Sequence, residues 1–197
     1  MNEDQQSEKA WLDWIEVQRE AATLIRRGDH DAALSNVEAF LSRETNPELR
    51  SDALGFRADL KGRLGNIAGA KDDLITARTE VGPSYGRYVH ELSLGTLCES
   101  QNLPDEAISW YREALKTCLQ GDHISAGTVI DRLINLRPPA ALSPEDIDLC
   151  QQAIRRSWQV LRLPGIPDLS DLPSSVSEIN AAQARPLKAL DGDPNSS

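Results

Sequence analysis

Residues that could carry acid–base chemistry are few in this chain of 197 residues, and they are spread along it. The three histidines are His30, His90 and His123. His30 and His123 each follow an aspartate in a glycine-containing turn, where a surface position is the simplest interpretation. Catalysis needs a nucleophile, a base or a metal to converge with its partners on one site. The histidines therefore do not predict a catalytic site.

Two groups of carboxylates could in principle bind a divalent cation. They are Asp72-Asp73 and the set Glu145, Asp146 and Asp148. Both occur where acids of helix surfaces or helix starts are common, which favours a structural role. No phosphate-binding glycine loop or known catalytic motif is present. We expect no enzyme activity, no cofactor and no metal.

Gly62, Gly65 and Gly69 are spaced for helix contacts and a turn. The cysteines Cys98, Cys118 and Cys150 lie 20 and 32 residues apart, without the close spacing of a zinc site. An odd number of cysteines without a secretory signal is typical of reduced thiols in the cytoplasm. The N-terminus is acidic and polar, the reverse of a targeting segment. We therefore expect a cytoplasmic protein.

The composition limits the classes of partner. The chain has 31 acidic and 21 basic residues, a formal charge of −10 and a pI of about 4.8. Such a surface repels phosphate backbones and anionic lipids, and no apolar run approaches the length of a bilayer span. We expect neither nucleic acid nor a membrane as partner. Abundant Ala, Leu, Glu and Arg favour helix.

Small residues recur with a fixed period and show which elements organise the chain. Ala33, Ala70 and Ala107 are spaced by 37 residues, twice over. The residues seven positions later are Phe40, Ala77 and Ala114, and those twelve positions earlier are Ala21, Ala58 and Gly95. Antiparallel helices approach closely only where the facing side chains are small, and one such pair cannot bury its apolar face alone. The period predicts a stack of helix pairs.

The stretch from Arg57 to Asn66 with Ala70, Asp73 and Ala77 resembles a tetratricopeptide repeat. The stretch from Leu94-Gly95 to Ala114-Leu115 resembles it most closely, and the resemblance covers about residues 14 to 119. The period exceeds the family's 34 residues, which implies longer turns that end at Pro47 and Pro83. The large aromatic residue common early in the family's first helix is replaced by Val17, Leu54 and Glu91. The resemblance implies an all-α fold, an α-solenoid of antiparallel helix pairs.

We expect helices at about residues 8–27, 30–43, 48–64, 67–80, 84–101, 104–119, 122–136 and 144–161. The last two lack the small-residue signature and form a degenerate capping pair after three repeats. The expected organisation is a disordered N-terminus at 1–7, a repeat domain at 8–161 and a proline-rich, largely disordered tail at 162–197. Within the tail, Leu163, Ile166, Leu169 and Leu172 either pack back onto the stack or form a linear motif for a partner, and a short helix near 175–184 fits the pattern.

The resemblance implies a non-catalytic protein–protein interaction module that holds a peptide or a partner protein in a concave groove. By the phase of the repeat, the groove-facing residues are Gln18, Ala22, Arg26, Gly55, Asp59, Arg63, Leu92, Thr96 and Glu99. The family's clamp for a terminal carboxylate needs cationic and amide side chains, but Gly55 and Asp59 stand at those positions, so we exclude that ligand. Arg26 and Arg63 are equivalent in phase and either grip acidic partner side chains together or pair with neighbouring acids.

Small size, acidity and the leucine-containing tail favour a narrower form of this function, a dedicated inhibitor or chaperone of one cognate protein. The alternative is structural self-assembly into a homo-oligomer. Trp11 and Trp14 lie three residues apart beside Ile15 on the first helix. This stripe is either core that covers the first repeat or a contact with a second copy.

Overall fold

The fold was obtained as a computed structural model that describes residues 3–121, 126–137, 141–161 and 171–184. The helices are α1 (Glu3–Arg26), α2 (His30–Leu41), α3 (Pro47–Arg63), α4 (Ile67–Glu80), the 3₁₀ helix η1 (Pro83–Tyr85), α5 (Arg87–Ser100), α6 (Pro104–Gly121), α7 (Ala126–Leu136), α8 (Pro144–Val160) and α9 (Leu172–Ala184). No strand occurs within these ranges.

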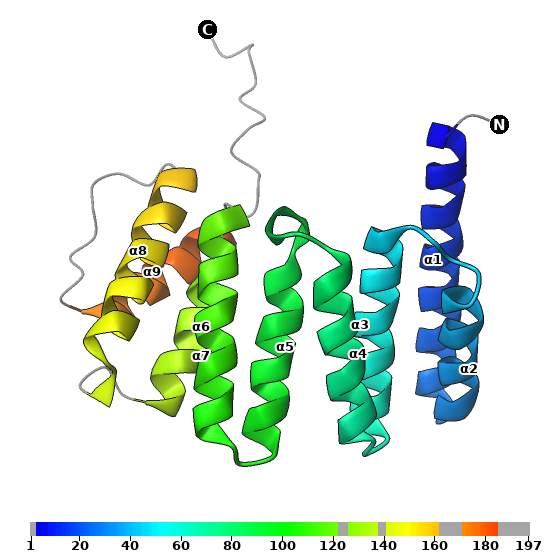
Figure 1. Cartoon of the computed structure of the whole chain (residues 1–197), viewed down its shortest axis with the longest axis horizontal. Coiled ribbons are helices and arrows are strands. Elements are labelled where there is room, and N and C mark those ends of the chain that lie inside the picture. Colours follow the sequence, from blue (N-terminus) through cyan, green and yellow to red (C-terminus); the bar gives the residue numbers. More distant parts are fainter. Residues whose placement is uncertain (1–2, 122–125, 138–140, 162–170, 185–197) are drawn as a thin grey trace, which may run out of the picture.

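The helix pairs follow one another along the long axis of the molecule, from α1 and α2 at one end to α8 and α9 at the other (Figure 1). Consecutive helices pack as antiparallel pairs, α1 with α2, α3 with α4, α5 with α6 and α7 with α8, and each pair contacts the next. The expected all-α solenoid is confirmed. The first helices of the first three pairs, α1, α3 and α5, carry the nine residues that the repeat pattern assigned to the groove.

Local sequence signals set the helix starts. Asn46 accepts hydrogen bonds from the backbone N–H groups of Glu48 and Leu49, and Pro47 occupies the first helical position. An asparagine or aspartate cap satisfies helix N–H groups that otherwise lack a partner. Gly28 and Gly65 end α1 and α3 with φ of 80° and 79°, a region that glycine enters without strain. The short turns inside each pair thus follow from the sequence.

Two boundaries differ from expectation. α1 begins at Glu3, so the expected disordered segment at 1–7 is too long: residues 3–7, rich in the helix formers Glu and Gln, belong to the helix. The expected helix at 84–101 is divided. Pro83 begins the short helix η1 instead. Gly86, with a φ of 86°, interrupts the helical conformation before α5 begins at Arg87.

The small residues of the repeat lie where helices touch. Ala33, Ala70 and Ala107 are fully buried. The tightest approach is at Gly95, where a Cβ atom would lie 2.2 Å from Cε1 of Tyr111 on α6. Glycine at this position lets the tyrosine ring lie directly on the backbone of α5. The spacing of 37 residues therefore records helix-to-helix contacts, as expected.

The buried apolar residues form three clusters. One joins α1, α2, α3 and α4 around Trp14 and Phe40. Another, the largest, joins α5 to α9, and the smallest lies between these two and contains Ala58, Ala70, Leu74 and Leu94. The middle of the stack therefore has the least buried apolar material.

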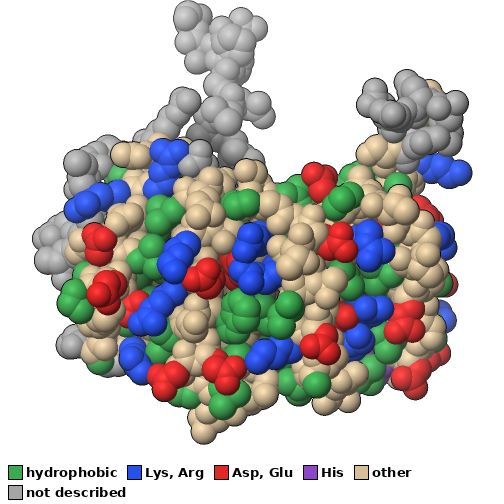
Figure 2. All heavy atoms as spheres, viewed as in Figure 1, with side chains coloured by type: hydrophobic (Ala, Val, Ile, Leu, Met, Phe, Trp, Pro, Cys, Tyr) green, Lys and Arg blue, Asp and Glu red, His purple; other side chains and the backbone are tan. Residues whose placement is uncertain are grey.

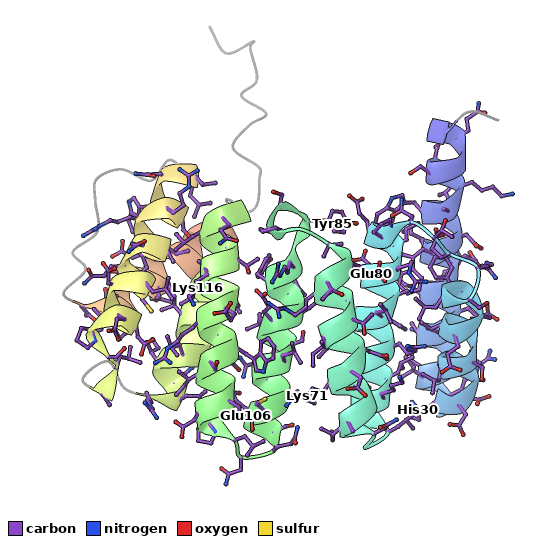
Figure 3. All side chains as sticks on the ribbon, viewed as in Figure 1. His30, Lys71, Glu80, Tyr85, Glu106 and Lys116 are labelled. Carbon is purple, nitrogen blue, oxygen red and sulfur yellow. The ribbon has the colours of Figure 1, made fainter. Side chains whose placement is uncertain are left out.

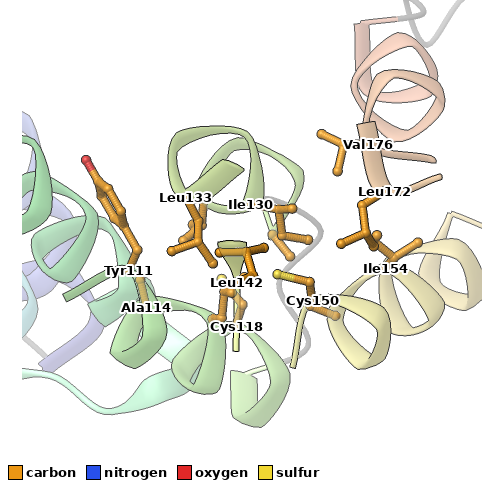
Figure 4. Packing of buried hydrophobic residues seen from close by; sticks show 14 of the residues in the cluster. Tyr111, Ala114, Cys118, Ile130, Leu133, Leu142, Cys150, Ile154, Leu172 and Val176 are labelled. Atoms are coloured by element: carbon orange, nitrogen blue, oxygen red, sulfur yellow. The ribbon is translucent and has the colours of Figure 1, made fainter. Parts of the chain in front are cut away.

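The C-terminal end of the stack is covered by α9. Its residues Leu172, Val176 and Ile179 are buried against α7 and α8, including Ile154 (Figure 4). Their spacing of four and three places them on one face of a helix. The expected short helix near 175–184 is present and begins earlier, at Leu172, so the expectation of a largely disordered tail is wrong for 172–184. Leu172 packs back onto the stack. Leu163, Ile166 and Leu169 lie outside the described residues.

Candidate functional site

A cleft of about 490 Å³ opens between α3 and α5. We call it the α3–α5 cleft. Its lining comes from α3, α4 and α5 and consists of Gly55, Ala58, Asp59, Gly62, Arg63, Ile67, Ala70, Leu74, Leu92, Ser93, Thr96, Leu97 and Ser100. Five of the nine predicted groove residues meet here, namely Gly55, Asp59, Arg63, Leu92 and Thr96. The buried part of the lining is apolar, with Ala58, Ala70 and Leu74, whereas the charged Asp59 and Arg63 are exposed.

The two glycines of α3 that line the cleft have different surroundings. A Cβ atom on Gly55 would lie 3.0 Å from Cε1 of His90, so this glycine makes room for the histidine ring. A Cβ atom on Gly62 would meet nothing within 4 Å. Gly62 thus keeps the cleft open, although its spacing suggested a helix contact. Its missing side chain is part of the cleft volume.

The charged groups of the cleft neutralise each other. Arg63 donates from Nε to Oδ2 of Asp59 at 2.8 Å, one turn apart on α3, and both side chains are more than half exposed. On α1, Arg26 donates to Oγ1 of Thr23 at 2.9 Å. Arg63 therefore pairs with a neighbouring acid, one of the two expectations for it. An exposed pair of this kind contributes little to stability.

The other predicted groove residues lie outside this cleft. Gln18, Ala22 and Arg26 belong to α1. Glu99 faces a second opening of about 500 Å³ between α5 and α7, where it accepts hydrogen bonds from the Tyr111 hydroxyl at 2.8 Å and from Arg132 at 3.4 Å. The repeat pattern assigned all nine residues to the first helix of a pair. It could not show between which helices the structure leaves a cleft.

Glu91, which replaces the family's aromatic residue, is a buried acid with 0% exposure. Its Oε1 accepts from Nη2 of Arg78 at 2.8 Å and from Nε of Arg87 at 3.0 Å, while Oε2 is buried without a hydrogen-bond partner. Arg78 in turn lies 5.3 Å from the ring centroid of Trp110. These contacts connect α4, α5 and α6 with polar groups at the place where the buried apolar cluster is smallest.

An acidic pair at the start of α3 escaped the sequence interpretation. Among the described residues, no cationic side chain lies within ion-pair distance of Glu48 or Asp52. Burial, together with the neighbouring charge of Glu48, raises the pKa of Asp52 above its usual range. Burial and these two carboxylates raise the pKa of Tyr85 to about 12. A spacing of four residues between two acids was the available signal.

The tryptophan pair is divided between core and surface. Trp14 is 1% exposed and packs with ring centroids 4.9 Å from Phe40 and 5.8 Å from Phe56. It is therefore core and offers no surface to a second copy, and Trp11 is only partly exposed. The exposed apolar residues of α1 are Leu12 and Ile15, at 60% and 55%.

The buried histidine beside the cleft and two buried cysteines farther along the stack have the properties of structural residues. His90 lies 2.7 Å from the Ser51 hydroxyl, and burial lowers its pKa to about 4, so the ring is neutral at pH 7. Burial raises the pKa of Cys118 and of Cys150 to about 12, which keeps both as thiols. Among the described residues, no three His, Cys, Asp or Glu side chains gather as a metal site would require. None of the helices in the described part of the chain combines the length and apolar composition needed to cross a bilayer.

Comparison with known proteins gives the fold. No protein-family profile matches the sequence, and no curated protein does either. Among solved structures, BtubC (BKLC) from P. vanneervenii is similar with a TM-score of 0.56 and 18% identity over 91% of this chain and 84% of that one. A tetratricopeptide repeat protein from Parabacteroides merdae has a TM-score of 0.44 and 13% identity over 91% and 77%. The first of these likenesses agrees with the helix pairs described above.

Proposed function

Because the chain folds as an α-solenoid of the tetratricopeptide type, we propose that it is an interaction module that binds a segment of a partner protein in the α3–α5 cleft. Stacks of this type present extended surfaces for binding and generally act without catalysis. In the narrower form of the proposal, the chain is a dedicated inhibitor or chaperone of one cognate protein.

The observation that carries this proposal is the cleft itself. Its floor is apolar and open, with Ala58, Leu74 and Leu92 in the lining, and its volume of about 490 Å³ falls within the usual range for ligand pockets. On the face shown in Figure 2, by contrast, acidic and basic side chains are interspersed. An apolar hollow on a charged protein is where a partner gains free energy by burying its own apolar side chains.

The substitution Gly62→Leu tests the proposal. A leucine here fills the cleft, while the helix is expected to tolerate it because leucine is a better helix former than glycine and its Cβ atom meets open space. Random peptides displayed on phage are selected on the wild-type chain and then retested on the variant. We expect the selected peptides to lose binding at least tenfold.

Ala39→Leu provides the control, since Ala39 is exposed on α2 and lies outside the cleft lining. This variant should keep the selected peptides. Peptides that bind wild type and Gly62→Leu equally would show that the cleft is not the binding site. One stoichiometric cellular partner that Gly62→Leu loses would support the narrower form.

Self-assembly is a second candidate, favoured by the exposed Leu12 and Ile15 on α1. Among the described residues, no helix covers the N-terminal end of the stack as α9 covers the C-terminal end. If a second copy covers this face, light scattering should show a dimer that Leu12→Glu with Ile15→Glu converts to a monomer. A wild-type chain that stays monomeric over a wide concentration range would contradict this candidate.

A further inference from the structure

Two acids at one end of the α3–α5 cleft, Glu48 and Asp52, are close together and, in the described part of the chain, without an ion-pair partner. Two nearby acids do have cations: Glu80 pairs with Arg50 at 3.2 Å, and Asp73 pairs with Arg57 at 2.7 Å. Glu48 and Asp52 have none among the described residues. The negative charge of these two carboxylates is therefore left for a group from outside the fold.

The acidic pair continues the same face of α3 that lines the cleft. At 3.6 residues per turn, Glu48, Asp52, Gly55, Asp59 and Gly62 fall within one narrow sector of the helix. Gly55, Asp59 and Gly62 line the cleft. Asp52 and Glu48 accordingly lie about one and two helical turns before Gly55, toward the N-terminus of α3.

Aromatic and further acidic groups border the carboxylates. Tyr85 and Glu80 lie close to each other beside the end of α3 (Figure 3) and, with Glu48, line a hollow of about 320 Å³. Burial and the two carboxylates raise the pKa of Tyr85 to about 12, so its hydroxyl, like that of an ordinary tyrosine, is protonated at neutral pH. The end of the groove is therefore suited to a cation, with carboxylates to pair with it and a phenol ring beside them.

We propose that the α3–α5 cleft binds a partner segment in which apolar residues stand next to lysine or arginine. The apolar side chains occupy the cleft, and the cationic side chain pairs with Glu48 and Asp52. This inference rests on the proposed function and adds the chemistry of its ligand. Complementary charge gives such a segment an advantage over an acidic one of equal apolarity, whereas the Asp59–Arg63 pair within the cleft favours neither sign.

Four fluorescein-labelled synthetic peptides of 12 residues serve as probes. Three carry the same two leucines, flanked by lysines, glutamates or serines, and the fourth carries the lysines with serines in place of leucines. Binding is followed by anisotropy with the full chain and with the double variant Glu48→Gln/Asp52→Asn. The matched control is Asp31→Asn/Asp72→Asn, which removes the same charge from exposed positions on α2 and α4.

We expect the lysine–leucine peptide to bind most tightly and to weaken with salt. The double variant should lower its affinity roughly 3- to 10-fold, as two partly exposed ion pairs would, while the control variant leaves it within about twofold. The double variant should also fold at least as stably as wild type, because it removes repulsion between two like charges one turn apart.

Two results would overturn the inference, and they separate it from the function beneath it. If the glutamate–leucine peptide binds as tightly as the lysine–leucine peptide, and Gly62→Leu abolishes both, the cleft binds peptides but has no preference for basic ones. If no leucine peptide shows binding that Gly62→Leu abolishes, the proposed function fails together with the inference.

Discussion

At the scale of single residues, two glycines within helices have opposite consequences. Gly95 lies against the ring of Tyr111, and Gly62 faces open space. A glycine inside a helix destabilises it relative to alanine by about 0.5–1 kcal/mol. At Gly95 this cost is offset by the close approach of two helices, whereas at Gly62 nothing in the fold offsets it. The glycine at 62 is therefore better explained by the cleft than by stability.

The exchange of each glycine for alanine should change stability in opposite directions. Gly95→Ala forces the tyrosine ring to move and should lower the free energy of unfolding by about 1–3 kcal/mol or more. Gly62→Ala should raise it by about 0.5–1 kcal/mol. Urea denaturation followed by circular dichroism measures both. Equal effects at the two positions would contradict this description of the stack.

At the scale of elements, α8 shows how a helix start is tied to its neighbour. Ser143 and Asp146 form a reciprocal capping box, and Asp146 also binds Nη2 of Arg112 on α6 at 2.7 Å. These hydrogen bonds, above all those from Arg112, lower the pKa of Asp146 to about 2. One carboxylate therefore both starts α8 and fixes it to α6.

This carboxylate should make stability depend on acid pH. Because the folded-state pKa of Asp146 is lower than its unfolded-state value, its contribution is complete above about pH 4 and is lost as pH falls toward 2. Asp146→Asn should cost about 1–2 kcal/mol at pH 7 and almost nothing at pH 2. Urea denaturation at both pH values measures the difference. Asp148→Asn, at an exposed site on α8, should show little of this pH dependence.

At the scale of the whole molecule, the two ends of the stack differ. The C-terminal end is covered by α9, whose Ile179 is fully buried, while the N-terminal helix exposes Leu12. Ile179→Ala should lower the free energy of unfolding by about 2–4 kcal/mol, and Leu12→Ala should change it by less than about 0.5 kcal/mol. Thermal and urea denaturation of the two variants test this. A mild effect at Ile179 would mean that α9 contributes little to the stack.

The sequence predicted what depends on neighbours along the chain. The period of Ala33, Ala70 and Ala107, with Pro47 as a helix opener, predicted the helix pairs and most of their bounds. It left open whether the apolar residues of the tail pack back onto the stack, because the sequence does not show where an isolated apolar stripe finds its partner. It marked Glu91 as unusual but could not show its two arginines, which come from α4 and α5. It missed Asp52 as a site residue because the lack of a cation is a property of the assembled fold.

The small middle cluster has a consequence for how the molecule unfolds. In a linear stack each unit is stabilised only by its neighbours, so the junction between α4 and α5 is where cooperativity should be weakest. Native-state hydrogen exchange should then show two blocks, one on each side of this junction, that open in separate reactions. A ligand in the α3–α5 cleft contacts both blocks, and binding should merge their two opening reactions into one.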